Sequence, residues 1–278
     1  MPVIGLGTYR SKGDNCRNVV KEAIRCGYRL IDTAAVYKNE EAVGAAVAEL
    51  IALGEVARED LFITTKISPR DQGYEKAYSA ALESLHLDCL LLHWPGSSGR
   101  RVDDPRNMAN RHESWRALER LYAEKKVRAI GVSNFNQYHL ENLLGEAGAT
   151  IVPHVNQFEF HPAIYPIQAS LTFYLEAKEI QPQAYSSFGE GALLNGSTII
   201  KGVLEIAEAR KATVAQVLLK WAMQHGFLVI PKTTSSQRLA ENLASGDIEL
   251  SPEDMIILNS SFTLESAQRF CWDSTFIV

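Results

Sequence analysis

The chain has 278 residues, more than a typical domain holds but close to the roughly 250 residues of an α/β barrel. Hydrophobic residues make up 46% of the sequence and charged residues 22%, an ordinary globular composition that supplies a sizeable core. The formal net charge of −5 disfavours a broad surface for nucleic acid, although it permits a local basic pocket.

The cysteines and the first residues indicate where the protein resides. The four cysteines are scattered without CxxC spacing, which favours free thiols in a reducing compartment: Cys16, Cys26, Cys89 and Cys271. Met1–Gly5 lacks the basic start and apolar core of a signal peptide, and the apolar stretches are too short to span a membrane. We therefore expect a soluble cytoplasmic protein without a membrane partner.

Eight short apolar runs recur along the chain, and longer amphipathic stretches separate them. Their lengths and flanking residues are typical of strands that are covered on both faces, where the alternation of polar and apolar residues disappears. In chain order, we predict strands over Ile4–Thr8, Leu30–Thr33, Leu61–Lys66, Cys89–His93, Val127–Asn134, His154–Phe160, Gln183–Ser187 and Phe227–Lys232.

The stretches between these runs carry signals of helix ends. Asp14 is predicted to cap a helix over Asn15–Cys26, which stops at Gly27. A second helix is predicted to open at Asn39 and to close at Gly54.

Two further helix starts are predicted in the last third of the chain. Thr213 with Gln216 forms the pattern of a capping box, and Ser251 with Asp254 marks another helix start. One face of the helix after Thr213 is apolar and consists of Val214, Val217, Leu218, Trp221 and Ala222.

The alternation of eight strands with helices predicts a parallel sheet, and eight units are the number that closes a (β/α)8 barrel. A doubly wound open sheet is the alternative that periodicity leaves open. The chain has no low-complexity linker or break in composition, so we expect a single domain over residues 1–278.

Polar residues able to bind a ligand or do chemistry stand at the end of nearly every predicted strand. Because the strands of a barrel are parallel, their carboxyl ends open onto one face, where the active sites of barrels lie. Any one of these residues is explained as a polar strand end, but eight together predict a shared site. They are Thr8, Asp32, Lys66, His93, Ser133 with Asn134, Gln157, Tyr185 with Ser186, and Lys232.

Many of these residues belong to longer motifs that run from about Val3 to about Asn259. In order and approximate spacing, the motifs resemble those of the aldo-keto reductase family. They are Gly5–Thr8 (GLGT), Tyr28–Ala34 (YRLIDTA) with Tyr37, Thr64–Lys66 (TTK), Leu92–Pro95 (LHWP), Gly131–Phe135 (GVSNF), Val155–Gln157 (VNQ), and Ile230–Lys232 (IPK) followed by Arg238, Glu241 and Asn242.

The resemblance implies a barrel enzyme, monomeric and without a metal, that reduces aldehydes or ketones with hydride from NADPH. It assigns catalysis to Tyr37, Asp32, Lys66 and His93. Each also has a structural explanation: a packing aromatic for Tyr37, a core histidine for His93, and an ion pair inside the barrel for Asp32 with Lys66.

The four implied catalytic residues form a coherent set for carbonyl reduction, which leaves an alkoxide that must be protonated. Tyr37 is the implied proton donor, but a tyrosine with a pKa near 10 donates poorly at neutral pH. An ammonium about 4 Å away favours the phenolate by up to about 4 kcal/mol at an effective dielectric constant of ~20. Lys66 is therefore expected to lower the pKa of Tyr37, with Asp32 aiming Lys66 and His93 orienting the carbonyl.

The resemblance also implies an NADPH site. Tyr185 would stack on the nicotinamide, and the loop after it would cover the pyrophosphate. Lys232 and Arg238 would pair with the 2′-phosphate, which NAD lacks; solvated side chains are the alternative for both. The full set of expected cofactor contacts is Gly7, Thr8, Tyr9, Asp32, Ser133, Asn134, Gln157, Tyr185, Ser186, Ser187, Phe188, Gly189, Lys232, Thr233, Ser235, Arg238, Glu241 and Asn242.

The small-molecule carbonyl substrate is expected against Tyr9, Tyr37, His93, Trp94 and Trp272. Specificity is expected to lie in three loops: residues 97–112, 189–200 and 264–278. His154 and His161 lie seven apart without cysteines or carboxylates in ligand spacing, so we expect no metal site.

Two departures from the family's pattern leave a second function open. The chain starts at its first barrel strand, so the usual N-terminal hairpin is expected to be missing, and the segment Leu85–Leu92 before His93 is about three residues short. Both features would suit an NADPH-binding regulatory or sensing subunit with little turnover on the same barrel.

Overall fold

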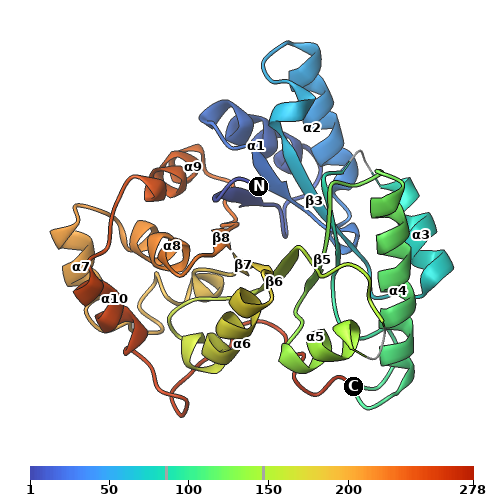
Figure 1. Cartoon of the computed structure of the whole chain (residues 1–278). Helices are drawn as coiled ribbons and strands as arrows, with labels where there is room; N and C mark the ends of the chain where they lie inside the picture. Colours follow the sequence, from blue (N-terminus) through green and yellow to red (C-terminus); the bar gives the residue numbers. More distant parts are fainter. Residues whose placement is uncertain (85–86, 146–147) are drawn as a thin grey trace.

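The computed structural model describes residues 1–84, 87–145 and 148–278 (Figure 1). Eight parallel strands pair in chain order from β1 to β8, and isolated parallel bridges join Ile4 to Val229 and Gly7 to Lys232. The sheet thus closes into the predicted (β/α)8 barrel, and the open doubly wound alternative is wrong. The strands are β1 Gly5–Gly7, β2 Leu30–Asp32, β3 Phe62–Ile67, β4 Cys89–Leu92, β5 Ala129–Ser133, β6 Val155–Glu159, β7 Gln181–Tyr185 and β8 Leu228–Val229.

Helices surround the barrel, as Figure 1 shows. The α-helices are α1 Gly13–Cys26, α2 Glu40–Ala52, α3 Tyr74–Glu83, α4 Arg106–Ala123, α5 Gln137–Leu144, α6 Tyr165–Ala177, α7 Val203–Ala209, α8 Val214–Gln224, α9 Ser236–Leu243 and α10 Pro252–Asn259. The described residues also form the short 3-10 helices η1 Ala35–Tyr37, η2 Arg58–Asp60, η3 Gly189–Gly191 and η4 Ala244–Gly246. No helix among the described residues is long and apolar enough to cross a membrane.

The predicted capping box at Thr213 and the predicted helix start at Ser251 are both confirmed, and the second is also a capping box. The Thr213 side chain accepts a hydrogen bond from the backbone N–H of Gln216 at the start of α8. The Ser251 side chain accepts one from the backbone N–H of Asp254 at the start of α10. In each box the second side chain bonds back to the backbone of the first residue, so two free amides of the helix start are satisfied together.

The prediction that Asp14 caps the first helix is wrong, although the predicted stop at Gly27 is confirmed. The chain leaves its extended conformation at Lys12, so α1 begins two residues early and Asp14 lies in its first turn. There its charge favours the positive end of the helix dipole without capping it. Gly27 adopts φ 112°, a left-handed conformation that a residue without Cβ tolerates.

The second helix begins and ends where predicted, and Asn39, the residue before it, has a further role. Asn39 precedes α2 and Gly54 follows its end with φ 71°. The Asn39 side chain is not used as a cap: its amide donates to the backbone oxygens of Thr8 and Ser11, and its oxygen accepts from Thr33. Asn39 therefore ties together the loops that follow β1 and β2.

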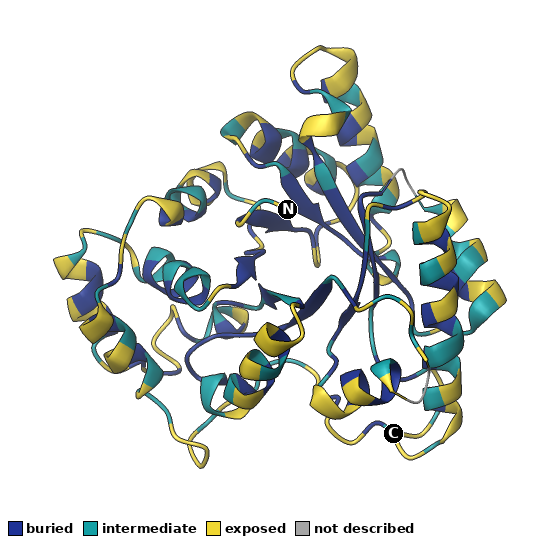
Figure 2. Ribbon diagram, in the orientation of Figure 1, coloured by how far each residue is buried: buried dark blue, intermediate teal, exposed yellow. Residues whose placement is uncertain are grey.

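Apolar side chains form two layers on either side of the sheet. The larger layer lies between strands and helices and includes Leu90 and Leu92 of β4. Cys89 and Leu91, which alternate with them, pack instead with Val155 in a small cluster. Because successive side chains of a strand face opposite ways, the small cluster fills the barrel interior. Figure 2 shows the buried strands enclosed by helices with exposed outer faces.

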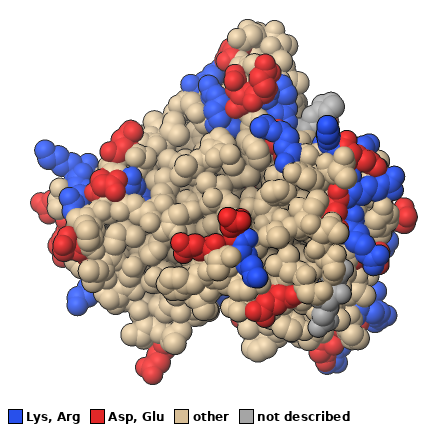
Figure 3. All heavy atoms as spheres, in the orientation of Figure 1, with Lys and Arg blue, Asp and Glu red and all other residues tan. Residues whose placement is uncertain are grey.

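Charged side chains of both signs are interspersed on the molecule. On the face seen in Figure 3 they lie mainly toward the edges, and much of the centre is uncharged. This distribution offers no extended basic face on that side.

Candidate active site

An ion pair lies inside the barrel at the carboxyl ends of β2 and β3. The Lys66 ammonium donates to Asp32 Oδ1 over 2.6 Å and to the backbone oxygen of Thr33 over 2.8 Å. From β6, Gln157 donates to Asp32 Oδ2 over 2.7 Å and to the Gln183 amide oxygen of β7 over 2.8 Å. Because β2 and β6 face each other across an eight-stranded barrel, both side chains point into its interior.

Burial and charge together determine the protonation states of Asp32 and Lys66. Lys66 is 1% exposed and Asp32 is 2% exposed. Burial raises the pKa of Asp32, and the charge of Lys66 opposes that change. Burial alone would lower the pKa of Lys66, but Asp32 and Tyr37 outweigh it and raise that pKa above its usual value. Lys66 is therefore protonated at neutral pH.

Tyr37 ends the short helix η1, beside the ion pair. The Lys66 ammonium lies 5.2 Å from the centroid of its ring, and the rings of Tyr9 and His93 lie 5.1 and 5.7 Å away between centroids. Burial raises the pKa of Tyr37 above its ordinary value near 10, and Lys66 acts in the opposite direction. Lys66 thus acts on the pKa of Tyr37 in the expected direction, but burial outweighs it. Tyr37 keeps the proton that a donor needs.

His93 follows β4 and is neutral. Burial, aided by the charge of Lys66, lowers the pKa of His93 to about 3. Its Nδ1 atom is buried and has no hydrogen-bond partner among the described residues. A buried N–H without a hydrogen-bond partner costs more free energy than a buried lone pair without one. The proton of His93 is therefore placed on Nε2. In this tautomer His93 can donate a hydrogen bond to a ligand.

The strand that directly precedes His93, β4, pairs with both of its neighbours. β4 is in register with β3 from Cys89 opposite Thr64 to Leu92 opposite Ile67, and the His93 amide donates to the Ile67 oxygen over 3.2 Å. Leu85 and His86, at the start of the segment expected to be short, lie outside the described residues. His93 nevertheless lies beside Tyr37.

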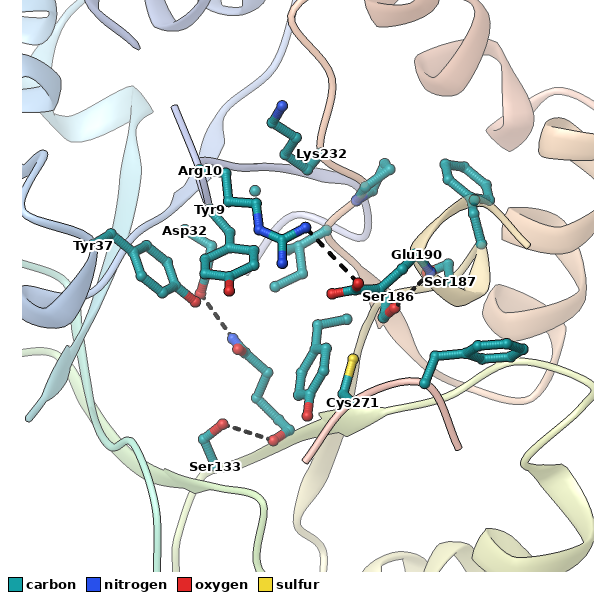
Figure 4. Close-up of a pocket in the computed structure, with 18 of the residues that line it drawn as sticks. Tyr9, Arg10, Asp32, Tyr37, Ser133, Ser186, Ser187, Glu190, Lys232 and Cys271 are labelled. Carbon is teal, nitrogen blue, oxygen red and sulfur yellow. Dashed lines mark hydrogen bonds and ion pairs between the residues drawn. The ribbon is translucent and has the colours of Figure 1, made fainter. Parts of the chain in front are cut away.

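These side chains meet at a cavity of about 520 Å³ at the carboxyl ends of the strands, within the usual size of ligand sites. Figure 4 shows Tyr37 and Asp32 on one side of it and Ser186, Ser187 and Glu190 on the other. The expected site residues that line it are Gly7, Tyr9, Asp32, Tyr37, His93, Ser133, Asn134, Gln157, Tyr185, Ser186, Ser187, Phe188, Lys232, Arg238 and Trp272. Lys66 lies buried behind this lining, on Asp32.

A hydrogen-bonded group at the ends of β5 and β7 forms one wall of the cavity. The Asn134 amide donates to Ser133 Oγ over 3.0 Å and to the backbone oxygen of His93 over 2.9 Å. The Tyr185 hydroxyl donates to Asn134 Oδ1 over 2.7 Å. Asn134 adopts φ 66°, an uncommon conformation for a residue other than glycine, which such bonds hold in place.

The opposite wall carries donors and cations that lack partners. The hydroxyl of Ser187 is buried and has no hydrogen-bond partner among the described residues. The exposed side chains of Lys232 and Arg238 line the same cavity, and neither makes an ion pair or side-chain hydrogen bond within the described part of the chain. Gly7 approaches the Ile230 backbone so closely that a Cβ would lie 2.7 Å from its oxygen. This wall suits an anionic ligand close to the backbone.

The remaining expected cofactor contacts are not part of the cavity lining. The Thr8 hydroxyl donates to the backbone oxygen of Asp32, and Glu241 accepts from Thr213. Ser235 caps α9. Thr233, Asn242 and Gly189 are buried.

Of the expected substrate contacts, Trp94 lies slightly apart from the others. It lines a smaller neighbouring cavity of about 200 Å³. Its ring lies edge-on to that of Trp272, with 6.4 Å between centroids. Trp94 thus packs against Trp272, which lines the main cavity.

Sequence reasoning missed several lining residues, among them Arg10, Glu190, Phe270 and Cys271. Arg10 and Glu190 form an ion pair of 3.8 Å across the cavity, which Figure 4 marks. In the sequence, Arg10 and Glu190 are only two charged residues in loops that lie far apart in the chain. Glu190 lies in the loop 189–200, and Phe270 and Cys271 lie in the loop 264–278; specificity was expected in both loops, but not from these particular residues.

The histidines considered as metal ligands bond to protein groups instead. His154 Nδ1 contacts the backbone of Ile130, and His161 Nε2 contacts Glu159. Within residues 1–84, 87–145 and 148–278, no group of three or more His, Cys, Asp or Glu is arranged to hold a metal ion.

The fold is a (β/α)8 barrel with a cavity at the carboxyl ends of its strands, and comparison with known proteins names the class. The model of the aldo/keto reductase family matches residues 3–261. A glyoxal reductase of Bacillus subtilis is 45% identical over 262 residues, which cover 92% of this chain and 87% of the relative. A 9,11-endoperoxide prostaglandin H2 reductase of Trypanosoma cruzi is 40% identical over 92% of this chain and 86% of its own length.

The solved structures agree. An aldo-keto reductase from a Medee basin deep-sea metagenome library, MGS-M4, superposes with a TM-score of 0.87 and 35% identity, covering 99% of this chain and 95% of its own. The chain belongs to the aldo/keto reductase family. It is accordingly an oxidoreductase of small-molecule carbonyl compounds.

Proposed function

We propose that this chain reduces aldehydes or ketones to alcohols with NADPH, and that Tyr37 donates the proton. The observation that carries the proposal is the convergence of Tyr37, His93 and the Asp32–Lys66 pair on one cavity. Structural roles alone would not require a phenol, an imidazole and an ion pair to meet at the same opening.

The proton chemistry of the site fits this reaction. When NADPH is bound, it supplies the hydride for the carbonyl carbon. Tyr37 is protonated in the resting site, and the nearby ammonium of Lys66 stabilises the phenolate that remains after proton transfer. The neutral His93 donates from Nε2 to the carbonyl oxygen and so orients it. Each role needs only the protonation state described above.

The cofactor is proposed to be NADPH rather than NADH because two cations of the cavity lack partners. Lys232 and Arg238 make no ion pair among the described residues, and a 2′-phosphate would satisfy both. The unpartnered Ser187 hydroxyl is a donor for the pyrophosphate. Ser133, Asn134 and Gln157 are proposed to face the nicotinamide carboxamide, and Tyr185 its ring.

Steady-state turnover tests the proposal directly. Purified protein is assayed with NADPH against aromatic aldehydes, ketones, quinones and small dicarbonyls, the last because one relative is named a glyoxal reductase. We expect multiple turnovers by the chain alone. Tight NADPH binding without turnover on the whole panel would instead favour the regulatory or sensing subunit.

A further inference from the structure

A carboxylate that the proposed reaction does not use is buried next to the cavity. Glu159 is the last residue of β6, and its side chain is 0% exposed. An ionised carboxylate in such a place is costly unless several donors bond to it. The identity of those donors therefore indicates what Glu159 does.

Most of the donors come from one short segment more than a hundred residues later in the chain. The backbone amide of Phe270 donates to Glu159 Oε1 over 2.8 Å, and that of Cys271 donates to Oε2 over 3.3 Å. The guanidinium of Arg269 lies 3.8 Å from Oε2. Three consecutive residues thus place donors around a single carboxylate.

The remaining donor is His161, which belongs to the same part of the barrel as Glu159. His161 Nε2 lies 3.0 Å from Glu159 Oε1, whereas its Nδ1 has no partner among the described residues. The tautomer with its proton on Nε2 satisfies both observations. The ring of Phe270 packs on His161 with 5.3 Å between centroids, so the histidine contacts both Glu159 and the segment that Glu159 binds.

The segment held by Glu159 forms a wall of the cavity. Phe270, Cys271 and Trp272 line it, and Glu159 itself does not. The ring of Phe270 lies against Gly189, where an added Cβ would be 2.7 Å from Phe270 Cε2. The wall is therefore fixed on one side by Glu159 and on the other by the loop after β7.

Trp272 gives this wall its chemical character. It is 71% exposed, and Tyr9, which lines the same cavity, is 38% exposed. Exposed aromatic side chains at the mouth of a cavity suit an aromatic or bulky apolar group attached to the reacting carbonyl. Small dicarbonyls carry no such group.

We propose that Glu159 is a positioning residue for substrate selection: it holds the wall Arg269–Trp272 in place and thereby favours carbonyl compounds with an aromatic group over small dicarbonyls. The inference rests on the proposed carbonyl reduction. It does not require Glu159 to touch substrate or cofactor.

The test compares Glu159→Gln with wild type on an aromatic aldehyde and on methylglyoxal. The variant preserves size but turns one oxygen into a donor facing a backbone N–H. Loss of a charge-assisted bond corresponds to about tenfold or more, so we expect the ratio of kcat/KM values, aromatic over small, to fall about tenfold, mainly through KM. The kcat for methylglyoxal should stay within threefold.

A double-variant cycle separates positioning from a general structural effect. If Glu159 acts through Trp272, Glu159→Gln should change the ratio little once Trp272→Ala is present. Additive effects would overturn the proposal. Glu49→Gln is the matched control, because Glu49 also pairs with cations, Arg17 and Lys21, but lies on the surface between α1 and α2.

Amide hydrogen exchange gives a readout without activity. In wild type, the amides of Phe270 and Cys271 should be protected, and Glu159→Gln should speed their exchange at least tenfold while Glu49→Gln leaves it unchanged. Rapid exchange in wild type would overturn the proposal. If Glu159→Gln fails to fold, Arg269→Gln decides: a smaller fall of the same ratio supports the proposal, and an unchanged ratio contradicts it. Wild type inactive on both substrates would refute the carbonyl reduction itself.

Discussion

Two groups of charged side chains lie at the same cavity and differ in how they are held. Asp32 and Lys66, on barrel strands, are buried and bonded to each other and to Gln157. Lys232 and Arg238, beyond β8, are exposed and make no side-chain bond among the described residues. The first group is complete in the protein alone, whereas the second has donors left for a ligand.

The difference shows how a barrel divides its tasks. Groups that act on reacting atoms gain from rigid positions, because preorganised charges need no rearrangement during the reaction. Groups that bind a large anion gain from exposure, because they exchange water for phosphate. Changes in the first group should therefore affect turnover and stability, and changes in the second should affect affinity.

The largest expected effect concerns Tyr37. Tyr37→Phe removes the proton donor but preserves the ring that packs with Tyr9 and His93. We expect kcat to fall at least ~10²-fold, since general acid catalysis contributes about that much, while NADPH affinity stays within a few-fold. Steady-state kinetics and a fluorescence titration measure the two quantities. Turnover equal to that of wild type would remove Tyr37 from its role.

Lys66 should affect both turnover and stability. Lys66→Met leaves Asp32 buried without its cation, which costs about 3–5 kcal/mol of unfolding free energy, and turnover should fall as in Tyr37→Phe. The double variant Asp32→Asn with Lys66→Met removes the unpaired charge, so it should regain much of the stability but not the activity. Denaturant unfolding and kinetics test this. Recovery of turnover in the double variant would mean that the pair is only structural.

Arg238 should affect cofactor choice and little else. A charge-assisted hydrogen bond to phosphate contributes about 1.5–3 kcal/mol, so Arg238→Ala should weaken NADPH binding by about 10- to 150-fold. NADH has no 2′-phosphate, and its affinity should hardly move. Fluorescence titration of both dinucleotides makes the comparison. Equal losses for the two would assign Arg238 to the fold or to the shared adenosine.

The smallest expected effect is a dependence of stability on acid. His139 is buried. Its Nδ1 accepts from the backbone N–H of Asn136, and its Nε2 contacts the backbone oxygen of Ile277. Burial lowers the pKa of His139 to about 4, while the bond to Ile277 opposes that change. Unfolded histidine titrates near 6.5, so the unfolded state binds more protons between about pH 6.5 and 4.

Stability from His139 is thus present above about pH 6.5 and is lost as the pH falls toward 4. We expect the unfolding free energy to decrease over this range in wild type and to decrease less in His139→Gln. Urea unfolding at pH 7 and pH 5 gives both values. The same slope in the two proteins would show that His139 does not contribute.

The strands of this barrel can be predicted from the sequence more reliably than the hydrogen bonds of its site. All eight strands were predicted because strands covered on both faces read as apolar runs, and their polar ends marked the cavity. The cap at Asp14 failed because a cap depends on where the chain leaves its extended conformation, here at Lys12. The raised pKa of Tyr37 depends on burial, which the local sequence does not contain.

Glu159 illustrates the same limit. It appears in the sequence as one acidic residue in an apolar run, and its partners Phe270 and Cys271 follow 111 and 112 residues later. Their donors are backbone amides, which every residue except proline has, so no residue type announces the contact. Only the closed barrel brings the tail segment to the end of β6.

The central claim is that hydride goes from NADPH to a carbonyl while Tyr37 supplies the proton. The most direct measurement uses NADPH in which both hydrogens at C4 of the dihydronicotinamide ring are replaced by deuterium, with an aromatic aldehyde and either wild type or Tyr37→Phe. We predict that the wild-type alcohol carries one deuterium on its carbinol carbon per labelled NADPH oxidised, and that the variant forms this product at least ~10²-fold more slowly. Alcohol without label, or equal rates for the two proteins, would contradict the account.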